Sequence, residues 1–78
     1  MTRYHIDRRD GGGWVRDVVG QKLPDRDAAR KAALQVLPDM ARDELPDGDR
    51  REFVVVVREG DGRLLFQATL ALTARWLG

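Results

Sequence analysis

Residues 53–73 constrain the fold of this chain more than any other stretch. "FVVVV" at 53–57 is dense in β-branched residues, which favour strands, and residues 64–73 alternate between apolar and polar side chains. Asp61–Gly62 is a favoured two-residue hairpin turn. Whether the loop is Gly60–Asp61 or Asp61–Gly62, odd-numbered residues of the first strand lie opposite even-numbered residues of the second. We therefore predict a β-hairpin with one apolar face. That face consists of Phe53, Val55, Val57, Leu64, Phe66, Ala68 and Leu70.

A second hairpin is predicted near the N-terminus, around three consecutive glycines. Residues 3–8 alternate as a half-buried strand does, and residues 14–19 predict the returning strand. A phosphate-binding loop would need a Lys-Ser or Lys-Thr pair and a following helix, so we interpret the glycines as a turn. If the loop runs from Asp10 to Gly13, Asp7 faces Arg16, and this opposite-charge pair favours that register.

One helix is predicted between the hairpins. Asp25 is the expected N-cap, and Asp27 lies in the positive first turn. Pro38 either breaks the helix at Leu37 or bends it; we favour one bent helix ending near Leu45. The predicted core stripe of this helix is Ala29, Ala32, Ala33, Val36, Leu37 and Met40, opposite Lys31, Gln35 and Arg42.

These elements predict a single α+β domain spanning residues 1–78. We expect a two-layer sandwich of β-β-α-β-β order, with one helix on one face of an antiparallel sheet made of two hairpins. A strand that is apolar on both sides generally has both sides covered. We therefore expect a second copy of the chain, in a homodimer, to cover the other face. The predicted self-association face is Val54, Val56, Leu65 and Ala71.

Composition argues against several classes of function. The chain has 14 basic and 13 acidic residues, whereas nucleic-acid binders commonly show a basic excess. It has no cysteine, and its only histidine, His5, is expected at the surface. We expect no catalytic, cofactor-binding or metal-binding residues, and therefore no enzyme. The apolar runs are too short to span a membrane and the N-terminus does not resemble a signal peptide, so we expect a cytoplasmic protein with no membrane partner.

The arginines of the first hairpin and the two tryptophans are the predicted partner contacts. Arginine beside an aromatic ring can bind nucleic acid, although interleaved aspartates oppose this here. Tryptophan is favoured at protein interfaces. We therefore predict a non-enzymatic binding module, self-associating through its sheet and open to a protein partner, or alternatively a nucleic-acid-binding or antitoxin-like regulator using the first hairpin. The predicted contacts are Arg8, Arg9, Trp14, Arg16 and Trp76.

Several short motifs follow one another in a recognisable order along the chain. They are Arg3–Tyr4, Arg9–Asp10–Gly11, Arg16–Asp17, Gly20, Leu23–Pro24–Asp25, Ala28–Ala29–Arg30, Phe53 and Asp61–Gly62–Arg63. Their order resembles a family of small bacterial domains of unknown function that is common in alphaproteobacteria. The resemblance covers nearly the whole chain and implies no activity or functional residues. A looser, fold-level similarity exists to HicB-type antitoxins, which place a strand hairpin before an alanine-rich helix.

Overall fold

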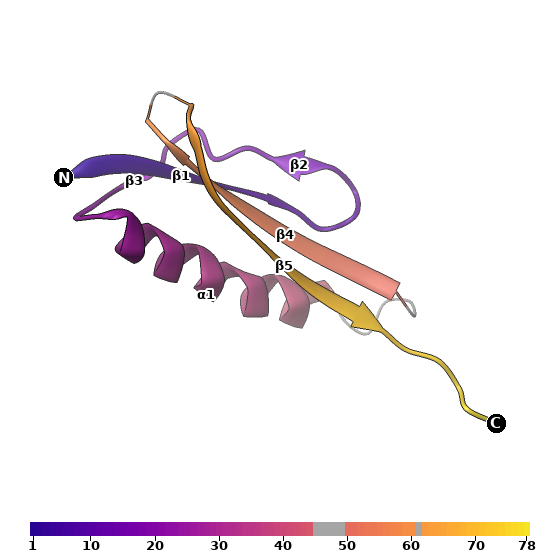
Figure 1. The fold of residues 1–78 in the computed structure, drawn as a ribbon. Coiled ribbons are helices and arrows are strands. Elements are labelled where there is room, and N and C mark those ends of the chain that lie inside the picture. Colours follow the sequence, from indigo (N-terminus) through magenta and orange to yellow (C-terminus); the bar gives the residue numbers. More distant parts are fainter. Residues whose placement is uncertain (45–49, 61) are drawn as a thin grey trace.

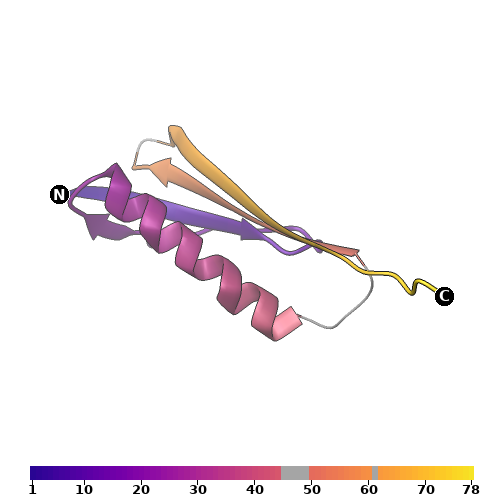
Figure 2. The ribbon, with the colours of Figure 1, turned by 60° about the horizontal axis from the view of Figure 1, so that its bottom comes forward.

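The computed structural model describes residues 1–44, 50–60 and 62–78. One helix packs along one side of a five-stranded antiparallel sheet, so the predicted two-layer α+β architecture is confirmed (Figure 1). Figure 2 shows the helix lying against a single face of that sheet. The elements are β1 (Thr2–Arg9), β2 (Trp14–Val15), β3 (Gln21–Leu23), α1 (Arg26–Glu44), β4 (Arg50–Glu59) and β5 (Leu64–Thr73).

The strand order is β2-β1-β4-β5, and β3 also pairs with β1. Since β4 takes one edge of β1, the short strands β2 and β3 follow one another along its other edge. Strand β4 is therefore central, which explains its run of valines: both of its edges are paired and half of its side chains are buried.

Helix α1 begins as the sequence predicts. The Asp25 carboxylate accepts a hydrogen bond from the Ala28 N–H at 2.9 Å, which satisfies a free donor of the first turn. The helix continues across Pro38 without a break, whereas its predicted end at Leu45 lies outside the described residues. Its alanine-rich stripe faces the sheet. The buried core is Tyr4, Ala29, Ala33, Leu37, Met40, Phe53, Val55 and Val57.

The β4–β5 hairpin contains one irregularity that decides which leucine packs inside. Val57 pairs with Phe66 but Arg58 pairs with Leu64, so Leu65 is the extra residue of a β-bulge. Leu65 packs against the core and Leu64 is exposed. The predicted faces of these two leucines were therefore wrong, because the bulge reverses the alternation. The predicted two-residue turn includes Asp61, which lies outside the described residues.

The predicted strand over residues 14–19 is interrupted. Arg8 pairs with Val15, as the expected loop requires, but Tyr4 pairs with Gln21. Tyr4 and Arg8 are four positions apart on β1, whereas their partners Gln21 and Val15 are six positions apart. The returning chain therefore carries two extra residues. Residues 16–20 leave the ladder at that point, and we call them the 16–20 loop.

Gly20 is required where this loop rejoins the sheet. Its φ is +70°, a conformation that side chains rarely adopt. A Cβ at this position would lie 2.8 Å from the Tyr4 carbonyl oxygen and 2.9 Å from His5 Cε1. Both the backbone conformation and the space therefore exclude a side chain.

We predict that Gly20→Ala lowers the free energy of unfolding by more than the ~1–3 kcal/mol expected for backbone strain alone, because the new methyl group also meets the β1 backbone. Urea denaturation followed by circular dichroism measures this loss. Gly12→Ala is the control, since its Cβ would meet only Asp10 Oδ1, at 3.7 Å, and Gly12 has no positive φ. Equal stability of the two variants would contradict the close approach at Gly20.

Candidate functional site

The sheet has one face without a helix, which we call the open face. Directly paired residues of neighbouring strands share a face, so the pairing defines its members. On the strands these are Arg3, His5, Asp7, Arg9, Trp14, Lys22, Arg50, Glu52, Val54, Val56, Arg58, Leu64, Gln67, Thr69, Ala71 and Thr73. The open face carries apolar side chains together with many charged ones, unlike a face buried in a core.

A buried ion pair lies in the middle of the open face. Arg58 of β4 donates to both carboxylate oxygens of Asp7 on β1, from Nε at 2.6 Å and from Nη2 at 3.1 Å. Arg58 is 8% exposed and Asp7 is 9% exposed. Two-point pairing of a guanidinium with a carboxylate is the strongest arrangement these groups make. The sequence reasoning missed Arg58 and paired Asp7 with Arg16 instead.

Asp17 anchors the 16–20 loop over this ion pair. Its carboxylate accepts the backbone N–H groups of Ile6, Val19 and Gly20, at 3.0, 3.2 and 2.9 Å. Its own N–H donates to Asp7 Oδ1 at 2.9 Å, and its carbonyl oxygen accepts from Arg58 Nη2 at 3.0 Å. The loop therefore replaces the missing strand-to-strand hydrogen bonds with side-chain hydrogen bonds. Its backbone at Asp17 also bonds to both partners of the ion pair.

Two further features complete this network. His5 is half-buried rather than at the surface, with Nδ1 2.8 Å from the Asp17 carbonyl oxygen. Arg3 Nη1 donates to the carbonyl oxygen of Val19 at 2.8 Å. Open-face side chains of β1 thus hold the loop at both its middle and its end. An Asp followed three residues later by a Gly, as at Asp17 and Gly20, was the available sequence signal for such a turn.

The network shifts the pKa values of its charged groups. Burial would raise the pKa of Asp7, but hydrogen bonds from Arg58 and the Asp17 N–H, with the charges of Arg58 and Arg16, bring that pKa below its ordinary 3.8. Burial likewise opposes the three backbone N–H bonds to Asp17, and the bonds again leave its pKa lowered. The hydrogen bond to Asp7 raises the pKa of Arg58. All three groups are therefore held in their charged forms.

Most residues of the predicted self-association face are not exposed. Val54 is 4% exposed, Val56 is half-buried beside the ion pair, and Leu65 packs against the core on the helix side. The prediction for Leu65 was wrong because of the bulge. Ala71 alone of the four is exposed, on the open face.

The predicted partner contacts are divided between several surfaces. Arg9 and Trp14 come together on the open face, with the guanidinium carbon 5.4 Å from the ring centroid, a cation–π contact. Arg16 lines a groove of about 530 Å³ on that face with Trp14, Val56, Leu64, Gln67 and the ion pair. Arg8 instead lies on the helix side with Met40 and three aspartates. Trp76 is 96% exposed beyond the end of β5.

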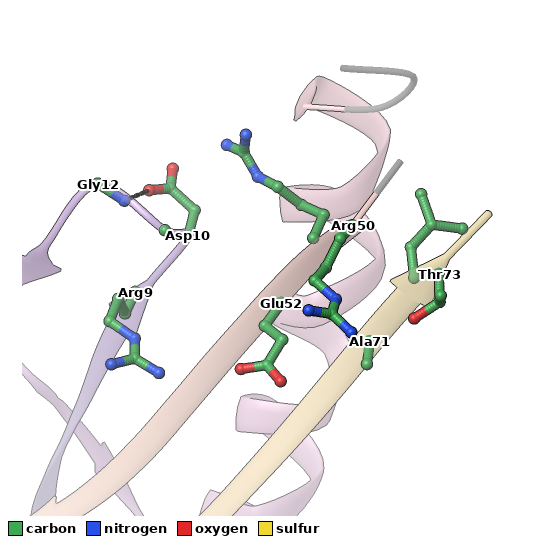
Figure 3. A pocket seen from close by; sticks show the side chains of 10 residues that line it. Arg9, Asp10, Gly12, Arg50, Glu52, Ala71 and Thr73 are labelled. Atoms are coloured by element: carbon green, nitrogen blue, oxygen red, sulfur yellow. Dashed lines mark hydrogen bonds between the residues drawn. The ribbon is translucent and has the colours of Figure 1, made fainter. Parts of the chain in front are cut away.

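A larger notch opens at one end of the sheet, where β4 and β5 extend past the end of β1. Figure 3 shows the glycine turn with Arg9 and Asp10 on one side, and Glu52 of β4 with Ala71 of β5 on the other. Its volume is about 1100 Å³. Sequence reasoning did not identify Arg50 and Arg51, which pairing of β4 with β5 brings to this end. The notch is lined by Arg9, Asp10, Gly11, Gly12, Arg50, Arg51, Glu52, Ala71, Leu72 and Thr73.

Two kinds of feature are absent from the described residues. No three His, Cys, Asp or Glu side chains within 1–44, 50–60 and 62–78 are grouped so that they could hold a metal ion. Over the same ranges, no helix combines the length and apolar composition needed to cross a lipid bilayer.

We predict strong energetic coupling between Asp7 and Arg58. Arg58→Met and Asp7→Val should each lower the free energy of unfolding by about 3–5 kcal/mol, because each leaves a buried charge without its partner. The double variant should lose clearly less than the sum. A double-mutant cycle by urea denaturation measures the coupling. The control cycle is Asp39 with Arg42, a 2.8 Å pair whose side chains are 71% exposed, for which at most about 1 kcal/mol is expected. Additive losses at Asp7 and Arg58 would contradict the pairing.

We also predict a specific acid sensitivity. Since the folded-state pKa values of Asp7 and Asp17 lie below 3.8, these groups stabilise the fold above that pH, and the stabilisation is lost as pH falls through the folded-state values. Asp17→Asn should reduce stability at neutral pH and flatten the acid limb of the stability profile. Denaturation midpoints measured from neutral pH down to about pH 2 test this. A variant limb as steep as that of the original protein would show that Asp17 does not contribute.

A known protein family matches most of this chain. Residues 3–71 match a family described as a domain of unknown function, DUF6894. No curated protein and no solved structure matches the chain. The matched region contains both partners of the ion pair, the 16–20 loop and the helix. The chain therefore belongs to the DUF6894 family, whose function is unknown.

Proposed function

We propose that this chain is a non-enzymatic interaction module that self-associates by pairing β5 with β5 of a second copy. The observation that carries the proposal is the sequence and position of β5. It is a ten-residue strand, "LLFQATLALT", with no charge and no proline. Among the described residues only β4 pairs with it, so its other edge presents backbone N–H and C=O groups without strand partners. Such edges are templates for pairing with another chain.

The opposite edge of the sheet makes a useful contrast. It is formed by β2, of two residues, and β3, of three, separated by the 16–20 loop. Short and interrupted edges resist pairing with other chains. Strand β5 has only its bulge, near Leu65, as a comparable protection. The asymmetry favours β5 as the associating edge.

Side-chain exposure supports the same edge. Helix α1 contacts β4 more extensively than β5, and Leu70 on the helix side of β5 is 41% exposed. A second β5 would place apolar cross-strand neighbours beside Leu70 and Leu72. An antiparallel pair about a two-fold axis perpendicular to the sheet would give one continuous sheet, with both helices on the same side.

A partner-binding role of the HicB antitoxin type is part of the same proposal, because a strand hairpin precedes an alanine-rich helix here. The similarity to that type concerns the arrangement of elements and not an activity. A cytoplasmic, bacterial setting belongs to the same proposal, supported by the cysteine-free composition and the family resemblance.

The test is the mass of the protein in solution. We expect light scattering coupled to gel filtration, at micromolar concentration, to give twice the 8.8 kDa of one chain. Thr69→Lys with Ala71→Lys should give monomers, because both positions are exposed on β5 and pairing would bring lysines of the two copies together.

The matched control adds the same charge elsewhere. Gln21→Lys with Gln35→Lys changes exposed positions on β3 and on the outer side of α1, and should remain dimeric. A monomeric parent protein, or dimers of the β5 variant as stable as those of the control, would overturn the proposal.

A further inference from the structure

Charge is segregated in the structure although it is balanced in the sequence. Cationic side chains outnumber carboxylates on and around the open face, where the Asp7–Arg58 pair neutralises itself. The carboxylate of Asp17 accepts hydrogen bonds from three backbone N–H groups. The cations are Arg3, Arg9, Arg16, Lys22 and Arg50, and the remaining carboxylates are Asp10, Asp17 and Glu52.

The outer side of the helix shows no such excess. Over residues 25–44 the chain carries four cationic and five anionic side chains. An overall net charge of +1 therefore conceals a sheet face that is more basic than the rest of the molecule. Such a face attracts polyanions, and its attraction depends on salt.

An aromatic ring stands among these cations. Trp14 is 53% exposed, and Arg9 lies over its ring and helps to hold the indole in place. Bases of single-stranded nucleic acids stack on exposed aromatic rings, while nearby arginines contact the phosphates. An acidic peptide would use the cations but would have little need for the ring.

The stacked pair of Arg9 and Trp14 lines two hollows, one through each residue. Trp14 lines the groove that also contains Arg16, Val56 and Leu64. Its stacked neighbour Arg9 lines the notch that contains Arg50 and Thr73 (Figure 3). The Arg9–Trp14 contact thus joins two hollows along the open face. An extended strand lying across the sheet would meet a cation in each hollow and the ring between them.

We propose that the open face binds single-stranded nucleic acid, with Trp14 stacked on a base and Arg9, Arg16 and Arg50 contacting phosphates. This inference goes beyond self-association and does not depend on it, because the open face is complete within one chain. Association through β5 leaves this face uncovered.

Fluorescence anisotropy of labelled oligo(dT) and oligo(U), each of about 16 nucleotides, tests the proposal at low salt. We expect binding with a Kd of about 100 µM or tighter, weakening as salt increases. Trp14→Ala should weaken binding by about 5- to 150-fold, the equivalent of stacking one base, and Trp14→Phe should retain part of it. Arg9→Gln with Arg50→Gln should weaken binding by at least about tenfold and reduce the salt dependence by roughly two phosphate contacts.

Matched variants separate this site from general electrostatics. Trp76→Ala removes the other tryptophan, and Arg26→Gln with Lys31→Gln removes two exposed helix charges; both should bind within about twofold of the parent protein if the site is on the open face. No binding at low salt, equal losses in the control and test variants, or tighter binding to a duplex of the same length would each overturn the proposal.

The β5 variant distinguishes the two proposals. If Thr69→Lys with Ala71→Lys is monomeric, it should still bind oligonucleotide, and adding Trp14→Ala to it should weaken that binding, because Arg9, Trp14 and Arg50 are unchanged and belong to a single chain. A parent protein that is monomeric but binds would support the nucleic-acid site and overturn self-association. A dimer that does not bind would do the reverse.

Discussion

The structure depends on one buried interaction, the ion pair between Asp7 and Arg58. It joins the two central strands on the face that the helix does not cover, and Asp17 joins the 16–20 loop to both partners. Burying two charges is costly unless their remaining hydrogen-bonding capacity is met, and here the backbone of Asp17 meets part of it. The two extra residues of the 16–20 loop and the absence of a side chain at Gly20 allow the Asp17 backbone to reach the ion pair. The centre of the second face is thus covered by polar groups instead of a second apolar layer.

This arrangement changes what the uncovered face can do. A face of exposed valines would favour association face to face. Here Val54 is buried and Val56 lies beside the ion pair, so the surface that remains is a mixture of arginines, one tryptophan, the exposed Leu64 and short side chains. The exposed backbone is concentrated at β5, on the opposite side of β4 from Asp7. The side chains of the open face and the backbone edge of β5 therefore lie at different places, and a partner bound to one does not compete with a partner bound to the other.

Local chemistry explains which parts of this structure the sequence predicts. Asp25 caps the helix, the alanine stripe faces the core and Arg9 pairs with Trp14, all of which depend on residues close together in the chain. The failures involve distant partners. Arg58 is 51 residues from Asp7, and an alternating pattern gives no sign that the bulge exchanges Leu64 and Leu65. Arg50 likewise reaches the open face only through strand pairing, so a count of charges along the chain suggested balance where the folded surface is uneven.

Symmetry makes the two proposed roles compatible. A two-fold axis perpendicular to the sheet, as antiparallel pairing of β5 requires, keeps both open faces on one side and both helices on the other. Two basic surfaces would then lie on the same side of one sheet, separated by the two uncharged β5 strands, each with its own Trp14. Binding of one strand across both would gain from effective concentration, since the second contact forms within an existing complex. A weak site on a single chain would become a stronger one on a dimer without any new contact. On this view the long uncharged edge and the basic face have complementary roles: the edge sets how many sites are held together, and the face determines what they hold.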